Sequence, residues 1–294
     1  MKDANKTAVI FTNHIRCLEE TKEVIKQFYP NNTDYYISTY DEDHGWMTAE
    51  EHSEQYELYK QETGRKAYIG LLHSPRLYHP LPDGKFDRLT KYFNFKNSFI
   101  GSREHSKAWF TKNFSNLLGE VDYKQLFTFG DAYQKYHGWL KVLETGIKYD
   151  KVIFQRCDLV PFKEDYTFFP NTYQNRILYA DSFRIFKGYL HFDDRFCFGS
   201  YDFWKSFFDR FVEKVNYSVD SPFVQKDKAF FTNHRICSSI LLHSNIYKNK
   251  KLPFYFKKIR KHNILQPFTI ENLKKIDDKD FYGKIPGYNY GVVN

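Results

Sequence analysis

The sequence predicts a single α/β domain with a mostly parallel central sheet flanked by helices. Short apolar runs at residues 8–12, 34–40 and 152–155 are typical of strands, and stretches with helical spacing of apolar residues lie between them. No internal repeat or low-complexity segment divides the 294 residues, which suffice for one large core. We expect the domain to cover 1–247, with an excursion out of the sheet at about 41–100, and 248–294 to be a basic, aromatic tail packed on or beside it.

The chain opens with a strand, a loop and a helix. After the apolar run 8–12, residues 15–29 place Leu18, Ile25 and Phe28 at helical spacing, and Pro30 stops the helix. The run 34–40 then predicts a second strand. A β-α-β unit of this kind places its two strands in parallel.

The elements that follow are predicted from the same two periodicities. Residues 41–63 are acidic with helical spacing, 75–84 are rich in Pro, His and Gly, and two helices are expected at 103–118 and 131–147, the second capped by Asp131 and ending at Gly146. Further strands are expected at 152–155, 176–180 and 195–199. A long helix capped by Ser200 should bury Phe203, Phe207, Phe211 and Val215, and another should cover 227–242.

Composition limits the classes of function. Lys and Arg number 44 against 36 Asp and Glu, and this formal charge of +8 favours anionic partners without choosing among them. The four cysteines form no CxxC pair, which argues against a structural zinc site or a disulfide framework. We find no apolar signal-peptide region and no run of membrane-spanning length, and we expect a cytoplasmic protein.

Charged side chains follow the strand 152–155. Arg156 and Asp158 come at its carboxyl end, which in an open α/β sheet borders the crevice where ligands bind. An Asp can hold a divalent cation and an Arg can pair with phosphate, so the two suit a diphosphate. The alternative is an ordinary turn or helix-cap acid, and the pattern by itself leaves it open.

The loop after the first strand is a second candidate. Thr12, Asn13 and Arg16 precede the first helix, where backbone amides and a cation make an anion site, although Arg16 also fits a simple surface position. Asp193 and Asp194, just before the run 195–199, are candidates for a general base, with at least one of them only a turn former. Sequence signatures of Ser-His-Asp hydrolases, P-loop proteins, HExxH metalloproteases and GxGxxG dinucleotide binders are lacking.

Four landmarks together resemble a family of bacterial and viral glycosyltransferase-like proteins of polysaccharide synthesis. They are NHIRCLEET at 13–21, STYD at 38–41, YDKVIFQRCDL at 149–159 and DRFCFGS at 194–200. Their order, across about residues 8–215, is more specific than any one of them. The resemblance implies a GT-A-like, Rossmann-like nucleotide-sugar fold, with Asp158 in the place of the last acid of a DxD motif.

Combined with the residues above, this fold gives each candidate a role. Arg16, Arg156, Asp158, Thr12 and Asn13 would bind the donor diphosphate, with Asp158 holding Mn²⁺ or Mg²⁺. Asp193 or Asp194 would act as the catalytic base if the reaction inverts the sugar configuration, and the sequence leaves inversion and retention open. Because Arg156 occupies the place of the first DxD acid, the cation is either held by one carboxylate or replaced by the charge of Arg156.

We therefore expect a glycosyltransferase that passes sugar from a nucleotide-sugar donor to a hydroxyl of a glycan acceptor, in surface polysaccharide or glycoprotein-glycan synthesis. The basic segment 248–261 is either a solvated surface or a peripheral contact with anionic membrane. The alternatives are a non-catalytic phosphate- or nucleic-acid-binding protein and another α/β group transferase. Our preferred interpretation involves no nucleic acid.

Overall fold

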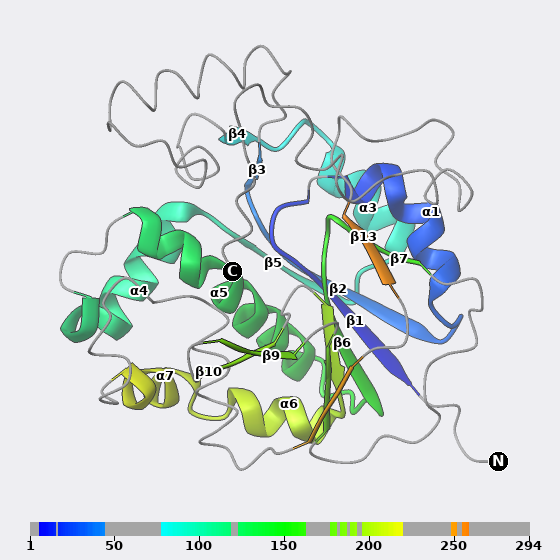
Figure 1. The fold of residues 1–294 in the computed structure, drawn as a ribbon. Helices are drawn as coiled ribbons and strands as arrows, with labels where there is room; N and C mark the ends of the chain where they lie inside the picture. The colour runs from blue at the N-terminus through cyan, green and yellow to red at the C-terminus, as the bar shows by residue number, and fades with distance from the viewer. Residues whose placement is uncertain are drawn as a thin grey trace, which may run out of the picture.

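The structure, a computed structural model, describes residues 6–15, 17–44, 78–118, 123–162, 177–180, 183–186, 189–192, 196–219, 248–251 and 255–258. Its central element is a seven-stranded sheet with the order β12-β8-β11-β6-β1-β2-β5 (Figure 1). In that order the strands are Lys248–Lys251, Ile177–Ala180, Phe196–Gly199, Lys151–Arg156, Thr7–Thr12, Thr33–Tyr40 and Asn97–Gly101.

The sheet is mostly parallel, as predicted. β1 pairs in parallel with β2 and with β6, and β2 pairs in parallel with β5. β11 is the exception, antiparallel to β6 on one side and to β8 on the other. Because β1, β2, β5 and β6 run in one direction, their carboxyl ends meet at one edge of the sheet.

Helices α1 (Leu18–Phe28) and α3 (Lys85–Phe93) cover one face of the sheet (Figure 1). Val9 and Phe11 of β1 point to this face and are fully buried with Leu18 and Leu89. The predicted apolar stripe of the first helix is confirmed, since Leu18, Ile25 and Phe28 are all buried. Burial of this kind, at about 1.5–3 kcal/mol per large side chain, holds the helix on the sheet.

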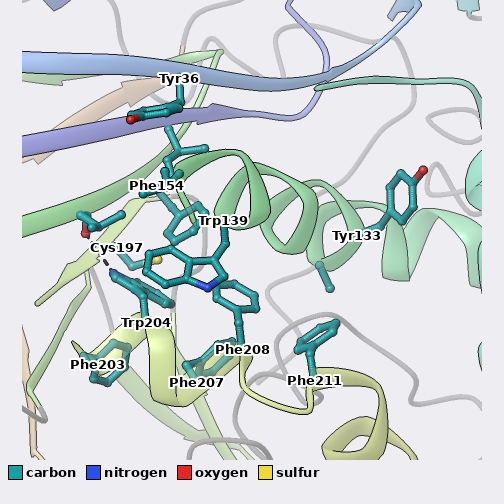
Figure 2. Close-up of a cluster of buried hydrophobic side chains, with 14 of the residues drawn as sticks. Tyr36, Tyr133, Trp139, Phe154, Cys197, Phe203, Trp204, Phe207, Phe208 and Phe211 are labelled. Atoms are coloured by element: carbon teal, nitrogen blue, oxygen red, sulfur yellow. Dashed lines mark hydrogen bonds between the residues drawn. The ribbon is translucent and has the colours of Figure 1, made fainter. Parts of the chain in front are cut away.

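The other face is covered by α4 (Arg103–Leu118), α5 (Tyr123–Glu144), α6 (Tyr201–Phe208) and α7 (Phe211–Val219). Figure 2 shows its aromatic centre, where Trp139 of α5 and Trp204 and Phe208 of α6 surround Phe154 of β6. The Trp204 indole donates a hydrogen bond to the carbonyl of Val152 at 3.0 Å, which satisfies its polar atom in the core.

Helix α5 lies unusually close to the strands. A Cβ atom at Gly138 would come within 2.7 Å of Ile10 Cγ2 and 3.1 Å of Ser38 Cβ. Only a glycine allows this approach, and it brings the amino-terminal half of α5 over the carboxyl ends of β1 and β2.

Two helix predictions are wrong in detail. Asp131 does not cap a helix; it lies inside α5, which begins at Tyr123, and its carboxylate pairs with Lys135 one turn later. The long helix expected after Ser200 is two helices, because Arg210 takes a left-handed conformation (φ 48°) between α6 and α7. The Ser200 cap itself is confirmed, with Ser200 Oγ accepting from the Phe203 amide at 3.0 Å.

The predicted excursion ends earlier than about residue 100. α3 contributes Leu89 and Phe93 to the core, and β5 is an edge strand of the central sheet. Residues 42–44 form β3 (Glu42–His44), antiparallel to β4 (Tyr78–Pro80), so the expected helix does not begin at 41.

The basic tail supplies strands to the fold. β12 adds to β8 at the edge of the sheet, and β13 (Tyr255–Lys258) pairs with β7 (Leu159–Phe162), the strand that follows Asp158. A separate antiparallel pair joins β9 (Phe183–Phe186) to β10 (Tyr189–Phe192). The division of the chain at residue 247 remains a prediction, and the helix expected at 227–242 lies outside the described residues.

Within the described helices, none has the length and apolar character needed to cross a bilayer. Cys17, Cys157 and Cys197 are buried in the two apolar clusters.

A histidine of α5 is expected to make the stability of the protein depend on pH. His137 stacks on Phe99 with ring centroids 4.3 Å apart, and its Nε2 has no hydrogen-bond partner among the described residues. Burial, followed by repulsion from His105 and Lys141, lowers the pKa of His137 to about 4. The native state therefore holds this ring neutral where the unfolded chain would protonate it.

Replacing His137→Phe should remove this acid sensitivity while keeping the stack on Phe99. Between the unfolded pKa of about 6.5 and the folded pKa of about 4, the unfolded chain binds more protons than the folded one. The stability of the wild type therefore decreases as the pH is lowered through this range. The free energy of unfolding of the variant relative to wild type should therefore grow by on the order of 1–2 kcal/mol from about pH 7 to about pH 4.5 in urea titrations. Parallel pH profiles would contradict a buried neutral ring.

Candidate functional site

Three polar residues stand side by side at the carboxyl edge of the sheet. Thr12, the last residue of β1, is the Cα partner of Ser38 in β2 and of Arg156 at the end of β6. Partners in parallel strands point to the same face, and Ile10, two residues before Thr12, is buried in the α5-facing cluster. Ser38, Thr12 and Arg156, the polar row, therefore face α5 at the edge where open α/β sheets bind ligands.

Arg156 and Asp158 form a two-pronged ion pair. Arg156 Nε donates to Asp158 Oδ1 at 3.0 Å, and Arg156 Nη2 donates to Asp158 Oδ2 at 2.8 Å. Charge-assisted bonds in this fork geometry are the strong kind, because the planar guanidinium matches both carboxylate oxygens at once. The predicted neighbours are thus in contact with each other.

The two members of the pair differ in exposure. The Asp158 side chain is 1% exposed, whereas that of Arg156 is 17% exposed. A buried carboxylate needs a fixed cation, and removing its partner would leave an uncompensated charge. The carboxylate consequently lies behind the guanidinium, and the guanidinium is the charge that reaches the edge of the sheet.

The loop after β1 is tied to both neighbours. Asn13 has φ 77°, a left-handed conformation that Asn tolerates, and its Nδ2 donates to Asp131 Oδ1 of α5 at 2.9 Å. The Cys157 amide donates to the carbonyl of Thr12 at 3.2 Å, joining the turn after β6 to the end of β1. These bonds hold the backbone of the edge in one conformation.

Two buried polar groups, one in the polar row and one beside it, have no partner among the described residues. Gln134 of α5 is fully buried, and its Oε1 accepts from Ser38 Oγ at 2.6 Å. Its Nε2, and the hydroxyl of Thr12, make no hydrogen bond within that part of the chain. Because an unmet buried donor costs about 1–3 kcal/mol, such groups normally meet an ordered water or a ligand.

An acidic turn after β2 borders the same edge. Glu42 is paired with Arg103, Asp43 with Lys85 at 2.9 Å, and the Glu42 carbonyl lies 3.2 Å from His14 Nδ1. Burial raises the pKa of Glu42 against the opposing hydrogen bond from Arg103. The turn is thus held by ion pairs on both sides.

A divalent cation does not fit Asp158 as the side chain is arranged. Both of its oxygens accept from Arg156, and a cation would have to displace that guanidinium from a site that is 1% exposed. Within the described residues, no group of three or more His, Cys, Asp or Glu side chains is placed to hold a metal ion.

The structure brings together four of the seven predicted site residues. Thr12, Asn13, Arg156 and Asp158 lie at one edge, joined through the Cys157 amide. Arg16, Asp193 and Asp194 lie outside the described residues, and their roles stay predictions.

Sequence reasoning missed the contribution of α5. Gln134 contacts Ser38 of the polar row, Asp131 contacts Asn13 in the loop after β1, and Lys135 pairs with Asp131. The available signal was the spacing of these three polar residues, which puts them on one face of the helix. The sequence pattern favours Asp131 as a helix cap, and that interpretation does not predict its contact with Asn13.

Comparison with known proteins identifies similar folds only distantly. No protein-family model matches the sequence, and no curated protein matches it significantly. Solved structures with similarity include galactosyltransferase LgtC with donor and acceptor sugar analogs (8% identity, TM-score 0.38, covering 81% of this chain and 70% of that one). The apo glycosyltransferase GlyE of Streptococcus pneumoniae TIGR4 gives 13% identity and a TM-score of 0.36 over 85% of this chain and 46% of its own.

Mouse xyloside xylosyltransferase 1 in its apo form gives 7% identity and a TM-score of 0.36, covering 84% of each chain. Similarities this weak assign no activity to this chain. An activity has to be argued from the residues of the chain itself.

A double-mutant cycle should show that Arg156 and Asp158 are energetically coupled. Arg156→Met, Asp158→Asn and the double variant should yield a coupling free energy of about 1–3 kcal/mol in urea unfolding, because each single change strands the other member. The matched control is the pair of Arg88 and Glu19, with the same fork at 2.5 and 3.2 Å but with Arg88 54% exposed. Its coupling should be smaller, and equal coupling in both cycles would contradict the importance of burial.

Proposed function

We propose that this protein is a glycosyltransferase that transfers a sugar from a nucleotide-sugar donor to a hydroxyl of a glycan acceptor. One observation carries the proposal: a guanidinium, oriented by a buried carboxylate, sits in the polar row at the carboxyl edge of a parallel sheet. That is where open α/β sheets take nucleotides, and a fixed cation there suits a phosphate leaving group. The four sequence landmarks support the same activity.

The reaction needs charge stabilisation at one place and a base at another. The bond between the sugar C1 and the phosphate oxygen breaks, and its electron pair stays on the departing phosphate. The acceptor hydroxyl oxygen bonds to C1, and in an inverting reaction its proton passes to a carboxylate. Arg156, with Arg16, would stabilise the departing phosphate, since preorganised charge costs no reorganisation during the reaction.

The proposed base is Asp193 or Asp194. Phe196, the first residue of β11, is the Cα partner of Gln155, next to Arg156. Because β11 is antiparallel to β6, it enters the sheet at the edge where β6 ends. This entry point supports a base in the segment that precedes β11.

The four landmarks further favour a role in surface polysaccharide or glycoprotein-glycan synthesis. The basic residues around β12 and β13 would suit peripheral contact with an anionic membrane, and we propose a cytoplasmic enzyme.

Nucleotide sugars should stabilise the protein against heat. In a thermal-shift panel of UDP-, GDP-, CDP- and dTDP-sugars, at least one donor at about 100 times its Kd should add about 2.7 kcal/mol of stability by mass action. The control variant Arg88→Met changes an exposed arginine and leaves the carboxyl edge intact, so it should show the same thermal shift with this donor as the wild type. If no donor shifts the melting temperature, the glycosyltransferase proposal fails.

The two candidate bases should separate cleanly. With the donor found above, one of Asp193→Asn and Asp194→Asn should lower kcat by about 10²–10⁴ while keeping the thermal shift with donor, because a general base acts on the acceptor. The other variant should stay within about tenfold of wild type and serve as its neighbour control. Normal kcat in both variants would remove these residues from the mechanism.

A further inference from the structure

We infer that this chain grips the diphosphate of its donor without a divalent cation, with Arg156 in the place of the metal and Asp158 as the residue that positions it. The inference rests on the proposed function and deepens it. The sequence leaves two ways to bind the donor diphosphate, a divalent cation held by Asp158 or the guanidinium of Arg156 without a cation, and this inference selects the second.

The first step concerns the carboxylate. A hard cation such as Mg²⁺ requires six oxygen ligands in near-ideal geometry and usually keeps several waters. Asp158 is 1% exposed, and both of its oxygens face the Arg156 guanidinium at 3.0 and 2.8 Å. A cation would have to displace this guanidinium, and breaking a buried pair in this way is strongly unfavourable.

The second step concerns the guanidinium. Arg156 ends β6, in register with Thr12, and is the more exposed member of the pair. A guanidinium has five N–H donors in a fixed plane, so one edge can hold a carboxylate while the group also meets a phosphate. An anion arriving at the sheet edge therefore meets the cation before it meets the buried carboxylate.

The third step concerns the surroundings. Asn13 ties the loop after β1 to Asp131, and the Cys157 amide bonds to the Thr12 carbonyl, so the turn after Arg156 and the neighbouring loop are both held in place. Preorganisation of this kind lowers the entropy lost on binding. Asp158 thus acts through Arg156, as a positioning residue and not as a metal ligand.

The test measures binding of the nucleoside diphosphates UDP, GDP, ADP and CDP by calorimetry, once with EDTA and once with Mn²⁺. The expected result is one nucleotide whose Kd agrees within about threefold in the two conditions. Arg156→Met should weaken this Kd at least tenfold in both, whereas Arg88→Met, which alters an exposed pair of the same geometry, should leave it unchanged.

Two further variants separate a positioning role from a metal ligand. Asp158→Asn should weaken nucleotide binding without creating or removing a response to Mn²⁺, and paramagnetic resonance of Mn²⁺ should show no ion bound to wild type that this variant loses. Arg156→Asp, which introduces a second carboxylate, should make nucleotide binding depend on Mn²⁺.

The outcomes distinguish the two levels of the proposal. Binding that requires Mn²⁺ in wild type, or an ion lost on Asp158→Asn, overturns the metal-free grip and leaves the glycosyltransferase proposal standing. Failure of every nucleotide and nucleotide sugar to bind in either condition overturns both.

Discussion

The ion pair between Arg156 and Asp158 is the interaction on which the site depends. Strand alternation sends Phe154 and Arg156 toward α5 and Gln155 toward α1, so the guanidinium arrives at the carboxyl edge only if β6 keeps its register with β1. Burial of Asp158 then fixes the guanidinium in one orientation. Register, burial and charge are linked, because a slip of one residue would turn the arginine into the α1-facing core.

The parts predicted from sequence are those set by local periodicity. The first β-α-β unit follows from two apolar runs and one amphipathic helix, and its parallel pairing is confirmed. The strand 152–155 and the cap at Ser200 could also be predicted, because each is determined by side chains that lie within a few residues of one another in the sequence. Four of the predicted site residues lie together because each stands at or just after the carboxyl end of a strand in a parallel sheet, and their roles stay predictions.

The parts that were missed depend on contacts between distant segments. The pairing of β12 with β8 and of β13 with β7 joins segments far apart in sequence, and their basic residues suggest a solvated tail. The role of Gln134 depends on Gly138, which lets α5 approach Ser38 closely enough for a hydrogen bond. The break at Arg210 is a single backbone conformation inside a continuous apolar pattern, which periodicity does not detect.

The spacing of two residues explains why an arginine can change the need for a cation. Arg156 ends β6 and Asp158 lies two residues later in the short turn before β7, and this close spacing brings their side chains together. Two carboxylates held in the same turn would repel each other, and a divalent cation would relieve that repulsion. With an arginine as the first member, the guanidinium of Arg156 balances the charge of the Asp158 carboxylate. In the proposed mode of binding, the guanidinium of Arg156 is the positive charge that faces a phosphate, and its position is fixed before any ligand arrives.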